Sequence, residues 1–266
     1  MSCRPMAADS ATITEDAVLG GRLRLRQPKR GHRVGHDAIL LAAATGVQAG
    51  EQVVDLGAGV GGAGLALAAR VAGVHVTLVE IDATLCDLAA ENIQLNRLED
   101  RARAVHADVE NVAGLSAAGV APGSFDRVLM NPPFNDAGRQ NVSPDPRRRL
   151  AHVAAPGLLK RWTETVAALL KPQGTLTLIW RADGLAEVRE ALEGAFGGLA
   201  VLAVLPREGA DAIRVLVRAV KDGKDREVAY PALVLNDAHN RPTAAAEAVL
   251  RSAEALPLAE SGPERP

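Results

Sequence analysis

Apolar positions along this chain recur in two alternating patterns. Short apolar runs at 52–57, 75–82, 102–108 and 125–130 have the length of buried strands. Two of the segments between them, GLALAARV and TLCDLAAENIQLN, carry apolar residues at helical spacing instead. Strands that alternate with helices are typical of a parallel sheet covered by helices on both faces. The pattern therefore predicts an α/β fold with a doubly wound sheet.

The second half of the chain adds an antiparallel element to this sheet. A helix, LLKRWTETVAALL, and a strand, TLTLIW, continue the alternation. The apolar segments 199–205 and 212–220 then follow, joined by the short polar turn PREGAD. So short a connection suits an antiparallel pair, because parallel strands need a long crossover. We therefore expect a hairpin here, followed by a strand-like YPALVL and a helix TAAAEAVLRSAEAL.

The ends of the chain differ from its middle. The first sixteen residues are expected to be poorly ordered, and GGRLRLRQPKRGHRVG alternates leucine with arginine as a short edge hairpin does. Asp37 is expected to cap the helix AILLAAATG. The chain contains no internal repeat. The prediction is one domain over 1–266, with disorder at 1–16, an N-terminal cap at 17–50, a core at 51–222 and a C-terminal extension at 223–256.

Composition excludes several classes of protein. The 266 residues are 48% hydrophobic and 23% charged, and no apolar run approaches the roughly 20 residues needed to cross a bilayer. The first residues lack the apolar segment of a secretory signal. The two cysteines, Cys3 and Cys86, are too few for a disulfide framework or a metal site. We expect a cytoplasmic protein with no membrane partner and no bound metal.

The segment VVDLGAGVGGAG joins the first core strand to the helix after it. Gly57, Gly59 and Gly61 permit a tight turn and let the backbone approach a ligand that a Cβ would exclude. Through Gly62 the spacing also satisfies the dinucleotide fingerprint, which alone is a weak signal. Asp55 would sit awkwardly beside a pyrophosphate but could receive an ammonium group. The loop therefore predicts a cofactor site, with the acid favouring a cofactor that carries an amine.

Two further acids end the next two strands. Glu80 can accept hydrogen bonds from both hydroxyls of a ribose, and Asp108 is placed to contact an adenine amino group. Together these positions resemble the cofactor motifs of class I S-adenosylmethionine-dependent methyltransferases, over residues 37–220. The resemblance implies a Rossmann-like, seven-stranded sheet whose last strand is antiparallel, as the predicted hairpin requires. It also implies S-adenosyl-L-methionine as the cofactor, bound by Asp55, Gly57, Gly59, Gly61, Glu80 and Asp108.

The tetrapeptide Asn131-Pro132-Pro133-Phe134 follows directly on the fourth strand. An exocyclic amine on a base, or an amide, is a poor nucleophile because its lone pair is delocalised. Accepting both N–H groups, with the Asn131 side-chain oxygen and the Pro132 carbonyl, favours pyramidalisation, and the prolines hold both acceptors in place. Phe134 offers a face on which a flat group stacks. The motif resembles that of amino methyltransferases and predicts these four residues as catalytic.

Positive charge is concentrated in two stretches, although the formal net charge is −2. Residues 17–36 contain no acid and six lysines or arginines, among them Arg30 and Arg33, and a second cluster begins at Arg147 and Arg148. Basic patches of this kind can contact phosphates. Arg30, Arg33, Arg147 and Arg148 are therefore predicted to contact an RNA substrate.

Two segments narrow the substrate by resemblance. LRLRQPKRGHRVGHDAILLAA resembles the N-terminal signature of the bacterial tRNA(Val) adenine-N6 methyltransferases, and YPALVLNDAHNRPTAAAEAVLR resembles their ending. This resemblance covers most of residues 17–252 and implies that Gln27, Arg33 and Asp37 line the entrance for the cofactor or the substrate. It predicts methylation of adenine N6 in tRNA, so the expected partner is an RNA.

Other functions remain open at this point. Methylation of guanine N2 in rRNA, or of glutamine N5 in a protein, uses the same motif, but glutamine-modifying enzymes usually carry a separate helical domain before the core. An NAD-linked oxidoreductase is favoured only by the glycine spacing and leaves the NPPF motif unexplained. A non-catalytic RNA-binding protein would not need intact motifs. The sequence also leaves open which RNA is modified and whether the chain forms oligomers.

Overall fold

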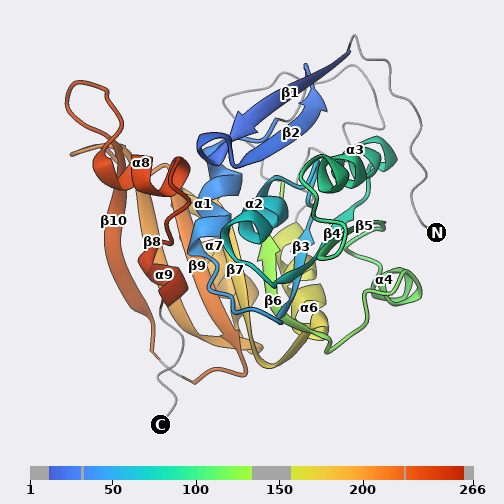
Figure 1. Ribbon diagram of the computed structural model, residues 1–266. Helices are drawn as coiled ribbons and strands as arrows, with labels where there is room; N and C mark the ends of the chain where they lie inside the picture. Colours follow the sequence, from blue (N-terminus) through green and yellow to red (C-terminus); the bar gives the residue numbers. More distant parts are fainter. Residues whose placement is uncertain (1–11, 31–32, 134–156, 225, 261–266) are drawn as a thin grey trace.

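The computed structural model describes residues 12–30, 33–133, 157–224 and 226–260. A mixed sheet of eight strands forms its centre, in the order β10-β8-β9-β7-β6-β3-β4-β5 (Figure 1). The strands are β3 (Gln52–Leu56), β4 (His75–Glu80), β5 (Ala102–His106), β6 (Phe125–Met130), β7 (Leu170–Arg181), β8 (Phe196–Arg207), β9 (Arg214–Lys221) and β10 (Val228–Asn236). The five strands from β5 to β7 pair in parallel, as the alternating pattern predicts.

Helices cover both faces of the sheet (Figure 1). Successive residues of a strand point to opposite faces, and Val53 packs in one hydrophobic cluster while Val54 packs in the other. The first cluster is closed by α1 (His36–Ala44), α2 (Gly62–Arg70) and α3 (Ala83–Leu95). The second is closed by α4 (Val112–Ala117), α6 (Leu158–Leu169) and α7 (Leu185–Leu192). The doubly wound, Rossmann-like fold is thereby confirmed.

The far end of the sheet contains the predicted antiparallel strand and one addition. β9 pairs antiparallel with both β7 and β8, so the seven core strands end as expected. The C-terminal extension then adds β10, which pairs in parallel with β8 and makes the sheet eight-stranded rather than seven-stranded. The physical reason is that β8 would otherwise present an open edge of unpaired backbone groups. The strand-like YPALVL therefore belongs to the main sheet.

The N-terminal hairpin begins earlier than predicted. It consists of β1 (Ile13–Val18), the 3-10 turn η2 (Leu19–Gly21) and β2 (Leu23–Pro28), and its strands pair antiparallel. Residues 13–16, expected to be poorly ordered, are thus part of a strand. The cause is charge pairing across the hairpin, because Glu15 forms ion pairs with both Arg24 and Arg26. Such a cause is invisible in the pattern of residues 1–16 themselves.

The last two helices of the described chain pack beside α1. They are α8 (Ala244–Leu250), which is shorter than the predicted helix TAAAEAVLRSAEAL, and α9 (Pro257–Glu260), which lies beyond that predicted helix. Between them the backbone turns away, and the Leu256 N–H donates to the Ala43 carbonyl of α1. This contact fixes the extension against the core. None of the described helices has the length and apolar character needed to cross a membrane.

Candidate active site

The carboxyl ends of β3, β4 and β6 meet at one edge of the sheet because these strands run parallel. The strand order reverses between β3 and β6, and open α/β sheets bind ligands in the crevice at such a reversal. Asp55 lies at the end of β3, Glu80 ends β4 and Asn131 follows β6. The fold therefore brings these three predicted residues to one edge.

The glycine loop, residues 57–62, adopts a conformation that explains its sequence. Gly57, Gly59 and Gly61 have φ angles of 70°, 58° and 90°, which side chains other than glycine rarely adopt. A Cβ on Gly57 would lie 2.7 Å from the Trp162 ring, whereas a Cβ on Gly59 would meet nothing within 4 Å. The loop is thus packed against the protein at Gly57 and open at Gly59, where a ligand can approach the backbone.

Asp55 is buried beneath this loop, with 2% of its surface exposed. Its Oδ2 accepts a hydrogen bond of 2.8 Å from the Gly64 N–H, which holds the first turn of α2 against the strand. Burial raises the pKa of the Asp55 carboxyl to about 7, and the charge of Glu80 acts in the same direction against the Gly64 bond. A cationic ligand group placed nearby would favour the ionised form, so Asp55 suits a cofactor with an ammonium group.

Glu80 joins the end of β4 to the glycine loop. Its Oε2 accepts from the Gly59 N–H at 2.8 Å, and its Oε1 accepts from the Asp82 N–H at 2.9 Å. Each carboxylate oxygen has two lone pairs, so both oxygens can still accept a hydroxyl donor. Glu80 therefore has a structural role that the sequence does not show, beside its predicted role as a ribose ligand.

Ile81 is a candidate that the sequence analysis missed. Its side chain is 53% exposed, directly after Glu80 and beside the end of β5, where the His106 ring nitrogen bonds the Ile81 carbonyl at 2.8 Å. The predicted adenine ligand Asp108 is exposed on the next strand end, with Oδ1 accepting from the Glu110 N–H. An exposed isoleucine at this edge offers an apolar face for a flat ring. The sequence does contain a signal for it, because Ile81 comes immediately after Glu80, the acid that ends the strand.

Asn131 carries the unusual polar atom of this edge. Its side-chain Oδ1 is buried and forms no hydrogen bond with the described part of the chain. Pro132 is buried beside it, and Pro133 is partly exposed. The fourth predicted catalytic residue, Phe134, lies outside the described residues. A buried acceptor oxygen beside a ligand crevice suits a donor that arrives with the substrate.

Comparison with known proteins identifies the family. Residues 33–206, which contain every strand end described above, match the methyltransferase small domain. The chain belongs to this methyltransferase family. It uses S-adenosylmethionine, and family membership excludes the oxidoreductase that the glycine spacing alone had left open. The residues present fit this cofactor, since the loop is open at Gly59, Ile81 is exposed, and the buried Asn131 oxygen after β6 has no partner within the described chain.

The chain is similar to methyltransferases that act on different substrates. A tRNA1(Val) (adenine(37)-N6)-methyltransferase of Dyadobacter fermentans is 27% identical over 80% of this chain and 84% of its own length. A release factor glutamine methyltransferase of Chlorobaculum tepidum is 33% identical over 60% of this chain, which spans 56% of that relative. A predicted O-methyltransferase of Agrobacterium tumefaciens has a similar structure, with a TM-score of 0.70, 29% identity, and coverage of 83% and 98% of the two chains.

The predicted phosphate ligands have different surroundings. Arg30 is exposed and forms no ion pair within the described chain, while Arg147 and Arg148 lie outside the described residues. Arg33 is engaged inside the hairpin, where it bonds Asp16 Oδ2 at 2.7 Å and also donates to Thr14 and to the Pro28 carbonyl. Its charge therefore already has a partner within the fold, and its contact with a phosphate stays a prediction.

Two more residues implied by the resemblance also stabilise the methyltransferase internally. Gln27 is buried, donates to Asp16 and accepts from the Val34 N–H. Asp37 lies in the first turn of α1, which begins at His36, and its carboxylate bonds Arg214 Nε of β9 at 2.8 Å. Gln27 thus fixes the backbone at Val34 and Asp37 pairs with a side chain of β9, and their place at an entrance stays a prediction.

A groove of about 620 Å³ lies beside this edge of the methyltransferase. Its walls are the hairpin turn, the segment leading into α1, the end of β10, and α8. The Val34 side chain belongs to this lining and also packs against the glycine loop, since a Cβ on Gly62 would lie 2.7 Å from it. The groove and the cofactor loop are therefore separated by a single segment of chain.

Proposed function

We propose that this methyltransferase modifies the exocyclic amino group of an RNA base, adenine N6 in tRNA. The observation that carries the proposal is the buried Asn131 Oδ1, which accepts no hydrogen bond from the described residues. Leaving a buried acceptor unpaired costs about 1–3 kcal/mol. The amino group of a bound base would supply the missing donor at the position where methylation takes place.

The residues after β6 would prepare this amino group for reaction. The Asn131 oxygen accepts one N–H and the Pro132 carbonyl accepts the other, which favours a pyramidal nitrogen whose lone pair is localised on the nitrogen and no longer delocalised into the ring. Pro132 and Pro133 fix these two acceptors before the substrate binds, so little reorganisation is needed. S-adenosylmethionine, when bound, supplies an electrophilic methyl group. The contribution of the chain is then to position the amine in line with it.

The cofactor is assigned to the glycine loop and the two strand ends beside it. Gly59 would give the ligand access to the backbone. Asp55, once ionised, would attract the ammonium group of the cofactor. The remaining lone pairs of Glu80 would accept the ribose hydroxyls. Ile81 would cover one face of the adenine ring and Asp108 would accept from its amino group. Arg30, Arg33, Arg147 and Arg148 are proposed to contact RNA phosphates.

Protein glutamine is the second candidate substrate. The relative that modifies release factor is 33% identical over 60% of this chain, and a glutamine amide presents the same pair of N–H groups to Asn131. Adenine in tRNA is preferred because the tRNA enzyme of Dyadobacter fermentans matches over more of both chains. The N2 amino group of guanine in rRNA presents the same two N–H donors, so it is a third candidate substrate.

Methyl transfer from labelled S-adenosylmethionine decides among these substrates. The full chain is incubated separately with unmethylated tRNA, unmethylated rRNA and unmodified release factor, and the products are digested and analysed by mass spectrometry. We expect N6-methyladenosine in tRNA. Label in guanine of rRNA, or in a release-factor glutamine, would retain the acceptor chemistry of Asn131 but overturn adenine in tRNA as the substrate.

A further inference from the structure

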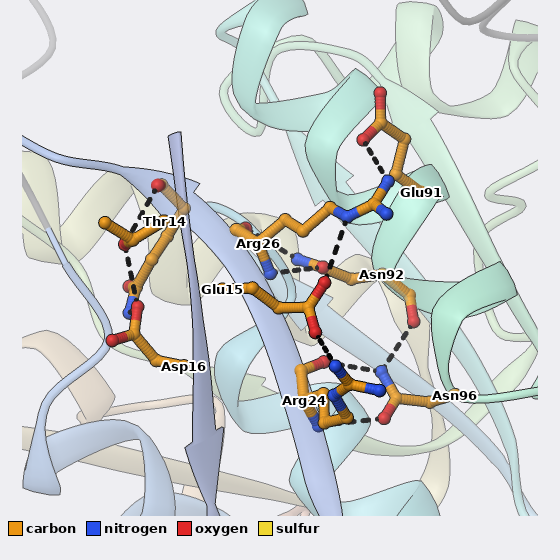
Figure 2. A network of polar contacts seen from close by, with 9 residues as sticks. Thr14, Glu15, Asp16, Arg24, Arg26, Glu91, Asn92 and Asn96 are labelled. Carbon is orange, nitrogen blue, oxygen red and sulfur yellow. Dashed lines mark hydrogen bonds and ion pairs between the residues drawn. The ribbon is translucent and has the colours of Figure 1, made fainter. Parts of the chain in front are cut away.

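Asn92 is a fully buried polar residue on α3, and its side chain contacts both β2 and the glycine loop. Figure 2 shows its contact with Arg26 of β2. Its Oδ1 accepts from the Arg26 N–H of β2 at 2.7 Å, and its Nδ2 donates to the Arg26 carbonyl at 3.0 Å. The same Nδ2 donates to the Val60 carbonyl of the glycine loop, also at 3.0 Å. The side chain thus ties the loop to both the helix and the hairpin, with both of its N–H donors used.

Asn96, one turn further along, makes a parallel set of contacts (Figure 2). It accepts from the Arg24 N–H at 2.9 Å, donates to the Arg24 carbonyl at 2.7 Å, and donates to the Asn92 carbonyl at 2.7 Å. Four residues of helix rise about 6 Å and two residues of strand span about 6.6 Å, so the two amides match alternate residues of β2. Each asparagine makes three hydrogen bonds, but among these bonds only those of Asn92 reach the glycine loop.

The bond to Val60 acts on a part of the loop that has a glycine on each side. Val60 stands between Gly59 and Gly61, both at positive φ, and glycines lose more conformational entropy on ordering than other residues. Glu80 fixes the Gly59 N–H, and the Gly61 N–H closes a turn onto the Ala58 carbonyl at 2.8 Å. Asn92 fixes the carbonyl between them. It therefore holds the peptide that follows the open position of the loop.

The hairpin also supports the loop from its other side. The Gln27 side chain of β2 accepts from the Val34 N–H at 2.9 Å, and the Val34 side chain packs against Gly62. β2 therefore reaches the loop at Val60 through Asn92 and at Gly62 through Val34. Two independent contacts from one strand restrict the same six residues, and Asn92 is the polar one.

We propose that Asn92 is a positioning residue for cofactor binding, which holds the Val60 carbonyl so that the glycine loop is ordered before S-adenosylmethionine arrives. The inference rests on the proposal that this loop holds the cofactor. Preorganisation lowers the entropy lost on binding, so Asn92 acts on cofactor affinity and not on the methyl-transfer step. It touches neither the substrate nor the reacting atoms.

Calorimetric titration of the full chain with S-adenosylmethionine tests this role. Asn92→Ala and Asn96→Ala each remove two bonds to the hairpin and one other. We expect the larger decrease in Tm in Asn92→Ala, because Asn92 is fully buried while Asn96 is partly exposed. We expect the Kd for S-adenosylmethionine to rise about tenfold in Asn92→Ala, the effect of one lost hydrogen bond, and less than about twofold in Asn96→Ala. In turnover assays KM for the cofactor should rise in Asn92→Ala while kcat at saturating cofactor stays within about twofold of the wild type.

Two further variants keep the outcomes distinct. Asn92→Leu has a similar size but neither the donors nor the acceptor; it should bind the cofactor as weakly as Asn92→Ala, and it replaces that variant if the cavity left by alanine prevents folding. Gly59→Ala places a Cβ in the open space of the loop and should abolish binding. If Gly59→Ala binds normally, the loop is not the cofactor site. If Gly59→Ala fails while Asn92 and Asn96 variants bind alike, the positioning role of Asn92 is overturned.

Discussion

Two neighbouring regions of this methyltransferase use their polar groups in opposite ways. At the sheet edge, Asn131 Oδ1 has no partner within the described chain and Gly59 faces open space. In the hairpin, Arg24, Arg26 and Arg33 are all bonded to acids. These three arginines of the hairpin therefore already have partners, whereas the less charged edge retains polar groups that are free to bind a ligand. Unused hydrogen-bonding capacity thus favours the proposed site at the sheet edge, whereas charge density alone would favour the hairpin.

Replacement of Asn131 should have the largest effect, because it removes the unused acceptor itself. In Asn131→Ala we expect the rate of methyl transfer to fall about 10³-fold, near the upper end of the losses seen when one preorganised polar group is removed. Cofactor affinity should stay within about twofold, since Asn131 is proposed to contact the substrate amine and not the cofactor. Single-turnover assays and calorimetry measure the two quantities separately. A variant that retains its turnover would show that Asn131 does not activate the amine.

Gly57 tests how strongly the sheet edge depends on its backbone. In Gly57→Ala the new Cβ meets the Trp162 ring at 2.7 Å, in addition to the strain of a φ of 70°. We expect a loss of about 3 kcal/mol in the free energy of unfolding, from strain and overpacking together. Gly50→Ala is the matched control, with a φ of 87° and nothing within 4 Å, and should lose about 1 kcal/mol. Equal losses in urea denaturation would show that the Trp162 contact is unimportant.

Asp55 links stability to pH at the same edge. Its pKa is raised from 3.8 to about 7 in the fold, so its contribution to stability is fully present below about pH 4 and is lost as the pH rises through 7. Three pH units correspond to about 4 kcal/mol; since relaxation around the charge reduces this, we expect cofactor-free Asp55→Asn to be about 2 kcal/mol more stable than the wild type at pH 8. This gain in stability should vanish toward pH 4. Asp55→Asn should also bind the cofactor more weakly than the wild type does.

Thermal unfolding of both proteins across pH 4–8 measures this difference. A gain of about 2 kcal/mol corresponds to a few degrees in Tm for a chain of this size. The asparagine oxygen can still accept from the Gly64 N–H, so the hydrogen bond that fixes α2 is retained as an internal control. A pH-independent difference between the two proteins would mean that the Asp55 carboxyl does not titrate in this range.

The same contrast explains which parts of the molecule could be predicted from sequence. The positive φ angles of Gly57, Gly59 and Gly61 are a local property, so the glycine letters reveal them. The order of β1 and the pairing of β10 with β8 depend on partners distant in the chain, which no local pattern contains. Asn92 was overlooked for that reason, although two asparagines four residues apart on an otherwise apolar helix face were a visible signal.

The smallest expected effect concerns the hairpin. It tests whether the charges of the hairpin serve only its own folding or also bind RNA. Glu15 neutralises Arg24 and Arg26, so Glu15→Gln should free positive charge at the surface. If tRNA passes over the hairpin, Glu15→Gln should tighten tRNA binding about twofold at low salt and steepen its salt dependence. Arg30→Gln should weaken it about twofold, because Arg30 is exposed and has no ion pair within the described chain.

Filter binding over a range of salt concentrations, with Tm as a check on folding, distinguishes these outcomes. Arg24→Gln is the matched control: it removes the same charge as Arg30→Gln, but from a residue already paired with Glu15, and should change affinity less. If all three variants bind tRNA as the wild type does, the charges of the hairpin serve only its folding. RNA contacts would then have to come from elsewhere in the chain, and the hairpin would act on the reaction only by supporting the glycine loop.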